Sequence, residues 1–114
     1  MADCLFCRII RKELPSRPVY EDDRVYAFED INPQAPVHIL IIPKEHILSL
    51  AETPPGRDEL LGRLLMVARE IAREKEIAGS GYRLVLNTGR DSGQAVGHIH
   101  FHLLGGRRMS WPPG

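Results

Sequence analysis

Three histidines stand at alternate positions near the C-terminus of this 114-residue chain, at His98, His100 and His102. Apolar residues stand between them, so in a β-strand the imidazoles would share one face while the apolar side chains enter a core. Residues on one face of a strand lie roughly 6.6–7 Å apart, which lets one imidazole attack a substrate atom while its neighbours contact the surrounding groups. Neutral imidazole is nucleophilic, and we interpret the row as a catalytic centre. An exposed face of an edge strand, or a metal clamp of all three histidines, is the alternative.

The residues just before this row are suited to holding an anion. Asn87 to Gln94 form a polar segment that contains glycines, and Gly93 allows the backbone to approach a ligand closely. Successive N–H groups in such a loop can form a concave site for phosphate oxygens. The segment is therefore a candidate phosphate site beside the histidines.

Cys4 and Cys7, three positions apart, are the only cysteines in the chain. In a cytosolic chain this spacing argues against a structural disulfide and leaves metal binding, redox chemistry or plain burial. Two cysteines supply half of a tetrahedral zinc site, which two histidines would complete.

Composition restricts the partners and the location. The 15 Lys and Arg residues balance 15 Asp and Glu residues, so the chain lacks the overall field typical of nucleic-acid and membrane binders, and we expect neither partner. No apolar run is long enough to span a bilayer and the N-terminus does not read as a signal peptide, so we expect a cytoplasmic protein. The length predicts a single domain over residues 1–114, part of whose surface a partner subunit can bury.

The elements that must position these residues can be read from apolar periodicity and turn residues. They predict a short helix at 4–12, strands at 18–20, 24–29 and 37–42, a long helix from 57 to about 77, and a strand at 83–87 before the histidine strand. The strand at 37–42 is a nearly continuous β-branched run, which indicates that both of its faces are covered. This order predicts an α+β domain with a roughly five-stranded antiparallel sheet, one long helix and one short helix.

The run His-Ile-His-Phe-His-Leu-Leu resembles the signature of the histidine-triad (HIT) nucleotide-binding proteins. The likeness covers nearly the whole chain, including Tyr20-Glu21-Asp22-Asp23, Asp30-Ile31-Asn32-Pro33-Gln34-Ala35-Pro36-Val37-His38, Ile42-Pro43-Lys44, Gly93-Gln94 and Trp111-Pro112-Pro113-Gly114. It is most similar to the branch that hydrolyses purine nucleoside phosphoramidates. The resemblance implies the HIT-like fold and a homodimer with a continuous ten-stranded sheet.

The resemblance also implies covalent catalysis. His100 would attack the α-phosphorus of a purine nucleoside 5′-phosphoramidate, and water would cleave the nucleotidyl-histidine to an AMP-type or GMP-type monophosphate after the amine has left. His38 and His98 would tune and orient His100, and His102 would contact the phosphate oxygens. This chemistry requires no metal. For His38, a hydrogen-bonded core histidine without a catalytic part is the alternative.

The nucleotide-binding residues follow from the same resemblance. Asp30 would accept the two ribose hydroxyls, and a capping or turn role is its alternative. The implied base pocket consists of Leu5, Phe6, Ile9, Phe28 and Ile31, which from sequence alone would simply be assigned to the core. The implied phosphate contacts are the backbone groups of Gly93 and Gln94 together with His102. Asn87 would steady the loop and the nucleotide, and Ala95 and His100 also belong to the implied nucleotide-binding set.

Two further features complete the implied site. Members with the N-terminal Cys-x-x-Cys resemble zinc binders, which implies a structural zinc on Cys4, Cys7, His46 and His98. Two thiols without metal are the alternative. Trp111 would reach toward the active site of the partner subunit, whereas in a monomer it would belong to a frayed tail.

Two positions depart from the family pattern. Ala95 stands where a serine hydroxyl usually assists the phosphate and the leaving group, so one donor is missing, although a backbone N–H at 95 or 96 can still serve the phosphate. Gly97 stands where an aromatic residue is common, which predicts a more open rim. The alternative function is that of a purine-nucleotide-binding regulatory or scaffold protein with little turnover.

Overall fold

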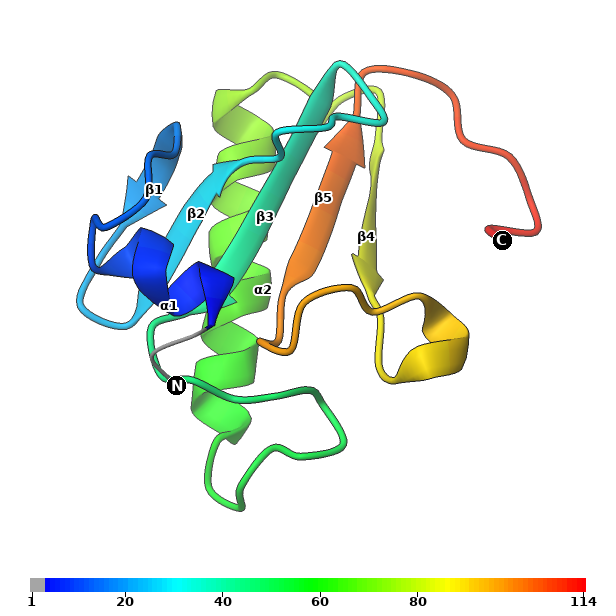
Figure 1. Ribbon diagram of the computed structural model, residues 1–114. Helices are drawn as coiled ribbons and strands as arrows, with labels where there is room; N and C mark the ends of the chain where they lie inside the picture. The colour runs from blue at the N-terminus through cyan, green and yellow to red at the C-terminus, as the bar shows by residue number, and fades with distance from the viewer. Residues whose placement is uncertain (1–3) are drawn as a thin grey trace.

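Residues 4–114 are described by the computed structural model, in which two helices pack on a single sheet (Figure 1). The elements are α1 (Leu5–Ile10), β1 (Pro18–Glu21), β2 (Val25–Glu29), β3 (Val37–Pro43), α2 (Asp58–Glu74), β4 (Tyr82–Leu86), the 3₁₀ turn η1 (Arg90–Ser92) and β5 (Phe101–Gly105). The expected α+β fold, with one long helix, one short helix and five antiparallel strands, is confirmed.

The strand order in the sheet is β1-β2-β3-β5-β4, and every neighbouring pair is antiparallel. β3 is the middle strand and is buried from His38 to Pro43, as its apolar run predicts. β5, which carries the last of the three histidines, lies between β3 and β4. β4 is left as an edge strand, and the C-terminal tail runs outward beyond it (Figure 1).

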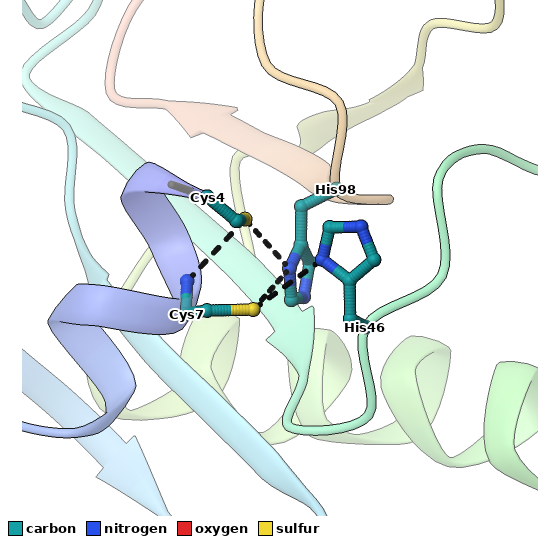
Figure 2. A group of neighbouring side chains, drawn as sticks. All are labelled: Cys4, Cys7, His46 and His98. Atoms are coloured by element: carbon teal, nitrogen blue, oxygen red, sulfur yellow. Dashed lines mark hydrogen bonds between the residues drawn. The ribbon is translucent and has the colours of Figure 1, made fainter. Parts of the chain in front are cut away.

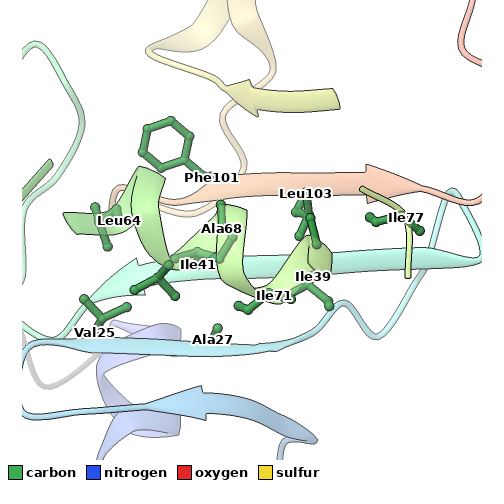
Figure 3. Packing of buried hydrophobic residues seen from close by; sticks show 12 residues of the cluster. Val25, Ala27, Ile39, Ile41, Leu64, Ala68, Ile71, Ile77, Phe101 and Leu103 are labelled. Carbon is green, nitrogen blue, oxygen red and sulfur yellow. The ribbon is translucent and has the colours of Figure 1, made fainter. Parts of the chain in front are cut away.

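α2 covers one face of the sheet with an apolar stripe at helical spacing. The cluster beneath it, drawn in Figure 3, consists of Val25, Ala27, Ile39, Ile41, Leu64, Val67, Ala68, Ile71, Ala72, Ile77, Phe101 and Leu103. A fully buried Leu or Ile side chain contributes about 1.5–3 kcal/mol. This face is the scaffold, and it presents no imidazole.

α1 covers part of the opposite face. Its N-cap is Cys4, whose Sγ accepts the Cys7 N–H at 3.4 Å. Phe6 and Ile9 then pack in a second cluster with Tyr26, Phe28, Leu40 and Ile42 of β2 and β3. On the neighbouring strands His102, Leu104 and Val85 are only half-buried, so this face becomes accessible where α1 ends.

The histidine strand is shorter than expected. β5 begins at Phe101, so only His102 of the three histidines lies in it, and His98 and His100 belong to the irregular segment before it. That segment is bonded to the loop after β3, since the Ile99 N–H donates to the Ile47 carbonyl at 2.7 Å. The side chains of this segment still alternate in direction. Ile99 joins a core cluster with Ile47, while His98 and His100 are buried elsewhere.

Neither helix within residues 4–114 combines the length and the apolarity that a bilayer span requires.

Candidate functional site

His100 is held by a main-chain hydrogen bond that fixes which of its nitrogens can react. Its Nδ1 lies 2.7 Å from the His98 carbonyl oxygen, which can only accept, so Nδ1 carries the proton. In a neutral imidazole the other nitrogen, Nε2, then retains its lone pair. The ring is buried. Its centroid lies 5.1 Å from that of Phe6, in an edge-to-face arrangement, and 5.0 Å from that of His102. His100 therefore presents a nucleophilic nitrogen.

His38 and His102 form a hydrogen-bonded pair across β3 and β5. His38 pairs with Leu104 in the sheet register and lies diagonally across from His102, on the same face. The Gln34 N–H donates to His38 Nδ1 at 3.0 Å, so the His38 proton is on Nε2. That Nε2 lies 2.9 Å from His102 Nδ1 and donates to it, which leaves the His102 proton on its own Nε2.

Asp30 completes this group, which we call the carboxylate–imidazole cluster: Asp30, His38 and His102. One Asp30 carboxylate oxygen lies 3.4 Å from His38 Nε2, and the other accepts the Asn32 N–H at 2.8 Å. The turn role that sequence left open for Asp30 is thus present, alongside a position next to the histidines.

Burial keeps the two imidazoles of this cluster neutral. It lowers the pKa of His102 to about 4, an effect that nearby His100 and His38 reinforce. Burial also lowers the pKa of His38, although the Asp30 carboxylate opposes it. At neutral pH the pair is therefore a neutral hydrogen-bonded chain that ends in the Nε2–H of His102.

The polar segment from Asn87 to Gln94, which we call the anion loop, is held by hydrogen bonds of its own backbone and of the Gln94 side chain. Gly89 and Gly93 have φ angles of 84° and 86°, which favour glycine. The N–H groups of Gly93 and Gln94 donate to the carbonyls of Arg90 and Gly89 at 3.1 and 3.4 Å. Within the part of the chain that the structure describes, the Ala95 and Val96 N–H groups donate to no protein acceptor. These two amides, more than those of Gly93 and Gln94, are available to phosphate oxygens.

The Gln94 side chain braces two loops. Its Oε1 accepts the Gly89 N–H at 2.9 Å, and its Nε2 donates to the Leu48 carbonyl at 2.8 Å and to the Val96 carbonyl at 3.1 Å. Sequence reasoning proposed only a backbone contact for Gln94 and missed this bracing, because the Leu48 carbonyl is 46 residues away and nothing local signals it.

The residues of the implied base pocket divide into two groups. Phe6, Ile9 and Phe28 are buried together where α1 meets β2. Leu5 is 47% exposed and Ile31 is fully exposed. The structure thus brings three of the five into one apolar wall and leaves the other two at the surface.

Asn87 and Trp111 lie on the β4 side. Asn87 directly follows β4 and is half-buried. Trp111 is 81% exposed, on a tail that Arg83 of β4 holds through a 3.0 Å hydrogen bond to the Ser110 carbonyl.

Four further side chains form the thiol–imidazole cluster: Cys4, Cys7, His46 and His98 (Figure 2). Cys4 Sγ and Cys7 Sγ lie 3.4 and 3.7 Å from His98 Nδ1, and Cys7 Sγ lies 3.3 Å from His46 Nδ1. In a tetrahedral zinc site, bonds of about 2.3 Å to sulfur and about 2.0 Å to nitrogen put these atoms about 3.5 Å apart. The four donor atoms are therefore already spaced as zinc ligands.

Hydrogen bonding and burial prepare this cluster for a cation. His98 Nε2 donates to the Pro43 carbonyl at 2.8 Å, which leaves the Nδ1 lone pair facing the sulfurs. Burial lowers the pKa of His98 to about 4, so the ring is neutral. Burial, together with neighbouring Cys4, raises the pKa of the Cys7 thiol to about 11, so deprotonation of this sulfur requires a positive charge at the centre.

A hollow of 410 Å³ lies beside the anion loop, and Gly97 is part of its lining. The other lining residues include Leu48, Ser49, Thr88, Arg90 and Gln94. A Cβ at position 97 would meet Leu48 Cδ1 at 2.9 Å. Position 97 is thus closely packed against Leu48, and the described lining of the hollow contains none of the histidines. The more open rim of the nucleotide pocket stays a prediction.

The antiparallel sheet and its buried histidines define a histidine-triad protein. A profile of the HIT domain matches residues 11–109, and the chain belongs to the HIT family. It is 52% identical over 112 residues to an uncharacterized HIT-like protein of Synechocystis, covering 98% of this chain and 97% of that one. It is 54% identical over 112 residues to a 14 kDa zinc-binding protein of Zea mays, covering 96% of this chain and 87% of that one.

The crystal structure of a HIT family hydrolase from Legionella pneumophila superimposes on the chain with a TM-score of 0.96. The two are 49% identical, and the match covers 98% of this chain and 100% of the hydrolase. The chain therefore has the fold of HIT family hydrolases, which generally act on nucleotides.

Proposed function

We propose that this protein hydrolyses purine nucleoside phosphoramidates through a covalent nucleotidyl-histidine. The observation that carries the proposal is the distribution of protons: His100 has its lone pair on Nε2, and His102, with its ring centroid 5.0 Å away, has its proton on Nε2. A nucleophile thus stands beside a hydrogen-bond donor, which is what attack on a phosphorus atom bearing anionic oxygens requires.

The reaction has two displacements. His100 Nε2 forms a bond to the α-phosphorus, the P–N bond breaks, and the amine leaves with that electron pair and gains a proton from water. Water then attacks the phosphorus and gives a proton to the hydroxide left by the first step, the bond to Nε2 breaks with its electron pair returning to the imidazole, and the nucleoside 5′-monophosphate is released. Throughout, the His98 carbonyl holds the Nδ1–H of His100 and stabilises the positive charge that develops on the ring.

The ligand is an AMP-type or GMP-type nucleotide. The amides of Ala95 and Val96 and the Nε2–H of His102 are the donors for the phosphate oxygens. The Asp30 carboxylate accepts the ribose hydroxyls, and the apolar wall of Phe6, Ile9 and Phe28 faces the base.

We also infer that the thiol–imidazole cluster binds a structural zinc ion. The support is the sulfur–nitrogen spacing of 3.3–3.7 Å, the free lone pair on His98 Nδ1, and the similarity to the zinc-binding protein of Zea mays. When bound, zinc supplies the positive charge that converts the two thiols to thiolates. It takes no part in the two displacements.

A homodimer is proposed from the edge of the sheet. β4 ends the sheet with unpaired backbone groups, and α2 exposes Leu65 and Met66. The tail that carries Trp111 is bonded to the same edge, where a second subunit would meet it. Sedimentation at micromolar concentration should give twice the chain mass, and a sole monomer peak would refute this part.

The covalent intermediate is the direct test of the proposed activity. Protein mixed with adenosine 5′-phosphoramidate and quenched within milliseconds should carry one AMP adduct, located on His100 by mass spectrometry. AMP binding without any adduct or turnover would instead favour the regulatory nucleotide-binding protein.

A further inference from the structure

The thiol–imidazole cluster and the proposed nucleophile share one residue. His98 supplies Nδ1 to the cluster through its side chain, and its carbonyl oxygen accepts the Nδ1–H of His100. The side chain is fixed at both ends, because Nε2 donates to the Pro43 carbonyl while Nδ1 faces the two sulfurs. Whatever holds the His98 ring therefore also fixes the carbonyl that determines the tautomer of His100.

α1 provides a second connection between the two sites. Cys4 caps this helix of 6 residues and Cys7 lies within it, so both sulfurs of the cluster are attached to α1. Phe6 lies between them in sequence, and its ring meets the rings of His98 and His100 edge-on, with centroids 5.9 and 5.1 Å apart. A helix this short is not stable by itself, so its position depends on these tertiary contacts.

Together these contacts leave α1 with few independent anchors. Apart from the apolar packing of Phe6, Ile9 and Ile10, the described attachments of the helix to the rest of the site run through Cys4 and Cys7 to His98 and His46. A metal ion bonded to all four donors would replace hydrogen bonds of 3.3–3.7 Å with short covalent-type bonds. It would thereby fix α1 against the segment that carries His98 and His100.

We propose that zinc in the thiol–imidazole cluster is a positioning element for the nucleotide site, coupled to it through the His98 carbonyl and through Phe6. The inference rests on the proposed function for the identity of the ligand, and it goes further by making nucleotide affinity depend on metal occupancy. The metal touches neither the nucleotide nor the reacting atoms, and the four ligands act as positioning residues.

Thermodynamic reciprocity gives the sharpest test. If zinc tightens AMP binding by some factor, AMP must tighten zinc binding by the same factor. We expect a factor of about tenfold or more, measured by calorimetric AMP titration of zinc-loaded and metal-free protein, and by competition for Zn²⁺ with a chromogenic chelator with and without saturating AMP. A factor below about twofold in both measurements would overturn the proposal.

Two variants separate coupling through contacts from coupling through overall folding. Phe6→Leu keeps all four zinc donors and an apolar side chain but removes the ring edge. We expect about one zinc per chain and a coupling factor reduced to about threefold or less. The matched control is Arg8→Ala on the same helix. The Arg8 side chain is exposed and, among residues 4–114, forms an ion pair with Glu13 alone, so this variant should show wild-type coupling. If the coupling instead arises from overall folding, the coupling factor of Phe6→Leu should equal or exceed that of wild type. That result would overturn the proposal.

The imidazole protons of His100 provide a readout that does not depend on AMP contacts. In the zinc-loaded protein the Nδ1–H should give a slowly exchanging NMR signal, which should broaden or disappear in the metal-free protein. An unchanged signal would contradict the His98 route. The proposed activity is assayed separately: coupling without turnover would refute the hydrolase and leave this inference standing, whereas turnover without coupling would do the reverse.

Discussion

Two clusters of metal-type donors contain the histidines that flank His100, one with His98 and the other with His102, and they differ in which of their atoms carry protons. In the thiol–imidazole cluster, His98 Nε2 donates to a carbonyl, so the free lone pair points into the cluster. In the carboxylate–imidazole cluster, the Gln34 N–H donates to His38 Nδ1, so His38 carries its proton on Nε2, which faces His102 inside the cluster. A metal there would have to displace that imidazole proton, whereas in the first cluster the His98 Nδ1 lone pair is free and a metal would displace only thiol protons.

The difference shows that donor type and proximity do not by themselves make a metal site. Both clusters have donor atoms within 4.8 Å of one another. What separates them is the backbone group that bonds the far side of one imidazole ring, a carbonyl at Pro43 and an amide at Gln34. The first arrangement suits zinc, and the second suits a chain of hydrogen bonds ending at the substrate.

The largest expected effect comes from the residue between the clusters. His100→Ala removes the nucleophile and should lower the hydrolysis of adenosine 5′-phosphoramidate by at least about 10³-fold, roughly 4 kcal/mol of barrier. AMP affinity should change little, because the ribose and base contacts lie elsewhere. Residual turnover within about tenfold of wild type, roughly 1.4 kcal/mol, would rule out the covalent role.

The metal content of the protein tests the assignment of zinc to the thiol–imidazole cluster and not to the carboxylate–imidazole cluster. Purified wild-type protein should hold about one zinc per chain, and Cys4→Ser combined with Cys7→Ser should remove it and lower the melting temperature by about 10 °C or more. Asp30→Asn, in the other cluster, is the matched control and should leave zinc content unchanged. Elemental analysis and calorimetry measure both quantities. Zinc that persists in the double thiol variant but is lost in the Asp30 variant would reverse the two assignments.

Breaking the hydrogen-bonded chain should reduce turnover without affecting metal. His38→Leu removes the donor to His102 Nδ1, so His102 no longer has a fixed tautomer, and kcat should fall about 10²-fold at unchanged zinc content. His38→Gln can still donate an N–H and should lose only about tenfold. Equal rates for both variants would mean that the hydrogen bond has no catalytic part.

The pH dependence of stability should reflect the neutral state of His102. Burial lowers its pKa from 6.5 to about 4 in the folded protein, so between these values the unfolded chain binds a proton that the folded chain does not. Its contribution to the free energy of unfolding is complete above pH 6.5 and is lost as the pH falls toward 4. Denaturant titrations of zinc-loaded wild type and His102→Gln should therefore show the steeper loss in wild type. Parallel curves would contradict the shift.

The smallest expected effect concerns the missing hydroxyl at position 95. Ala95 is exposed, so water can serve as a donor there, and Ala95→Ser should raise the rate several-fold, well below the roughly 10²-fold that an enclosed donor is worth. The gain should be confined to substrates with basic amine leaving groups. Equal gains on a substrate whose leaving group departs without a proton, or no gain at all, would show that leaving-group assistance is not limited by this position.

Local pattern was enough to predict much of the fold. Helical and strand periods depend on residues a few positions apart, so α2 and the strands β1 to β4 are predicted within a few residues. The nearly continuous apolar run at 37–42 indicates the buried middle strand. The exception is the histidine segment. Its apolar alternation predicted one strand through all three histidines, but the partner of Ile99 is the loop at Ile47, and strand pairing starts only at Phe101.

The sequence alone determined which side chains this protein has for its chemistry: alternating imidazoles, a glycine-containing polar loop and a pair of cysteines. Only the tertiary structure decided which nitrogen of each imidazole carries the proton and which groups face one another. Cys4 and His98 are 94 residues apart, and the groups that fix the tautomers of His98 and His100 are backbone carbonyls of the folded chain. A hydrogen bond depends on distances of about 3 Å, and spacing along the chain cannot specify such distances between segments that meet only on folding.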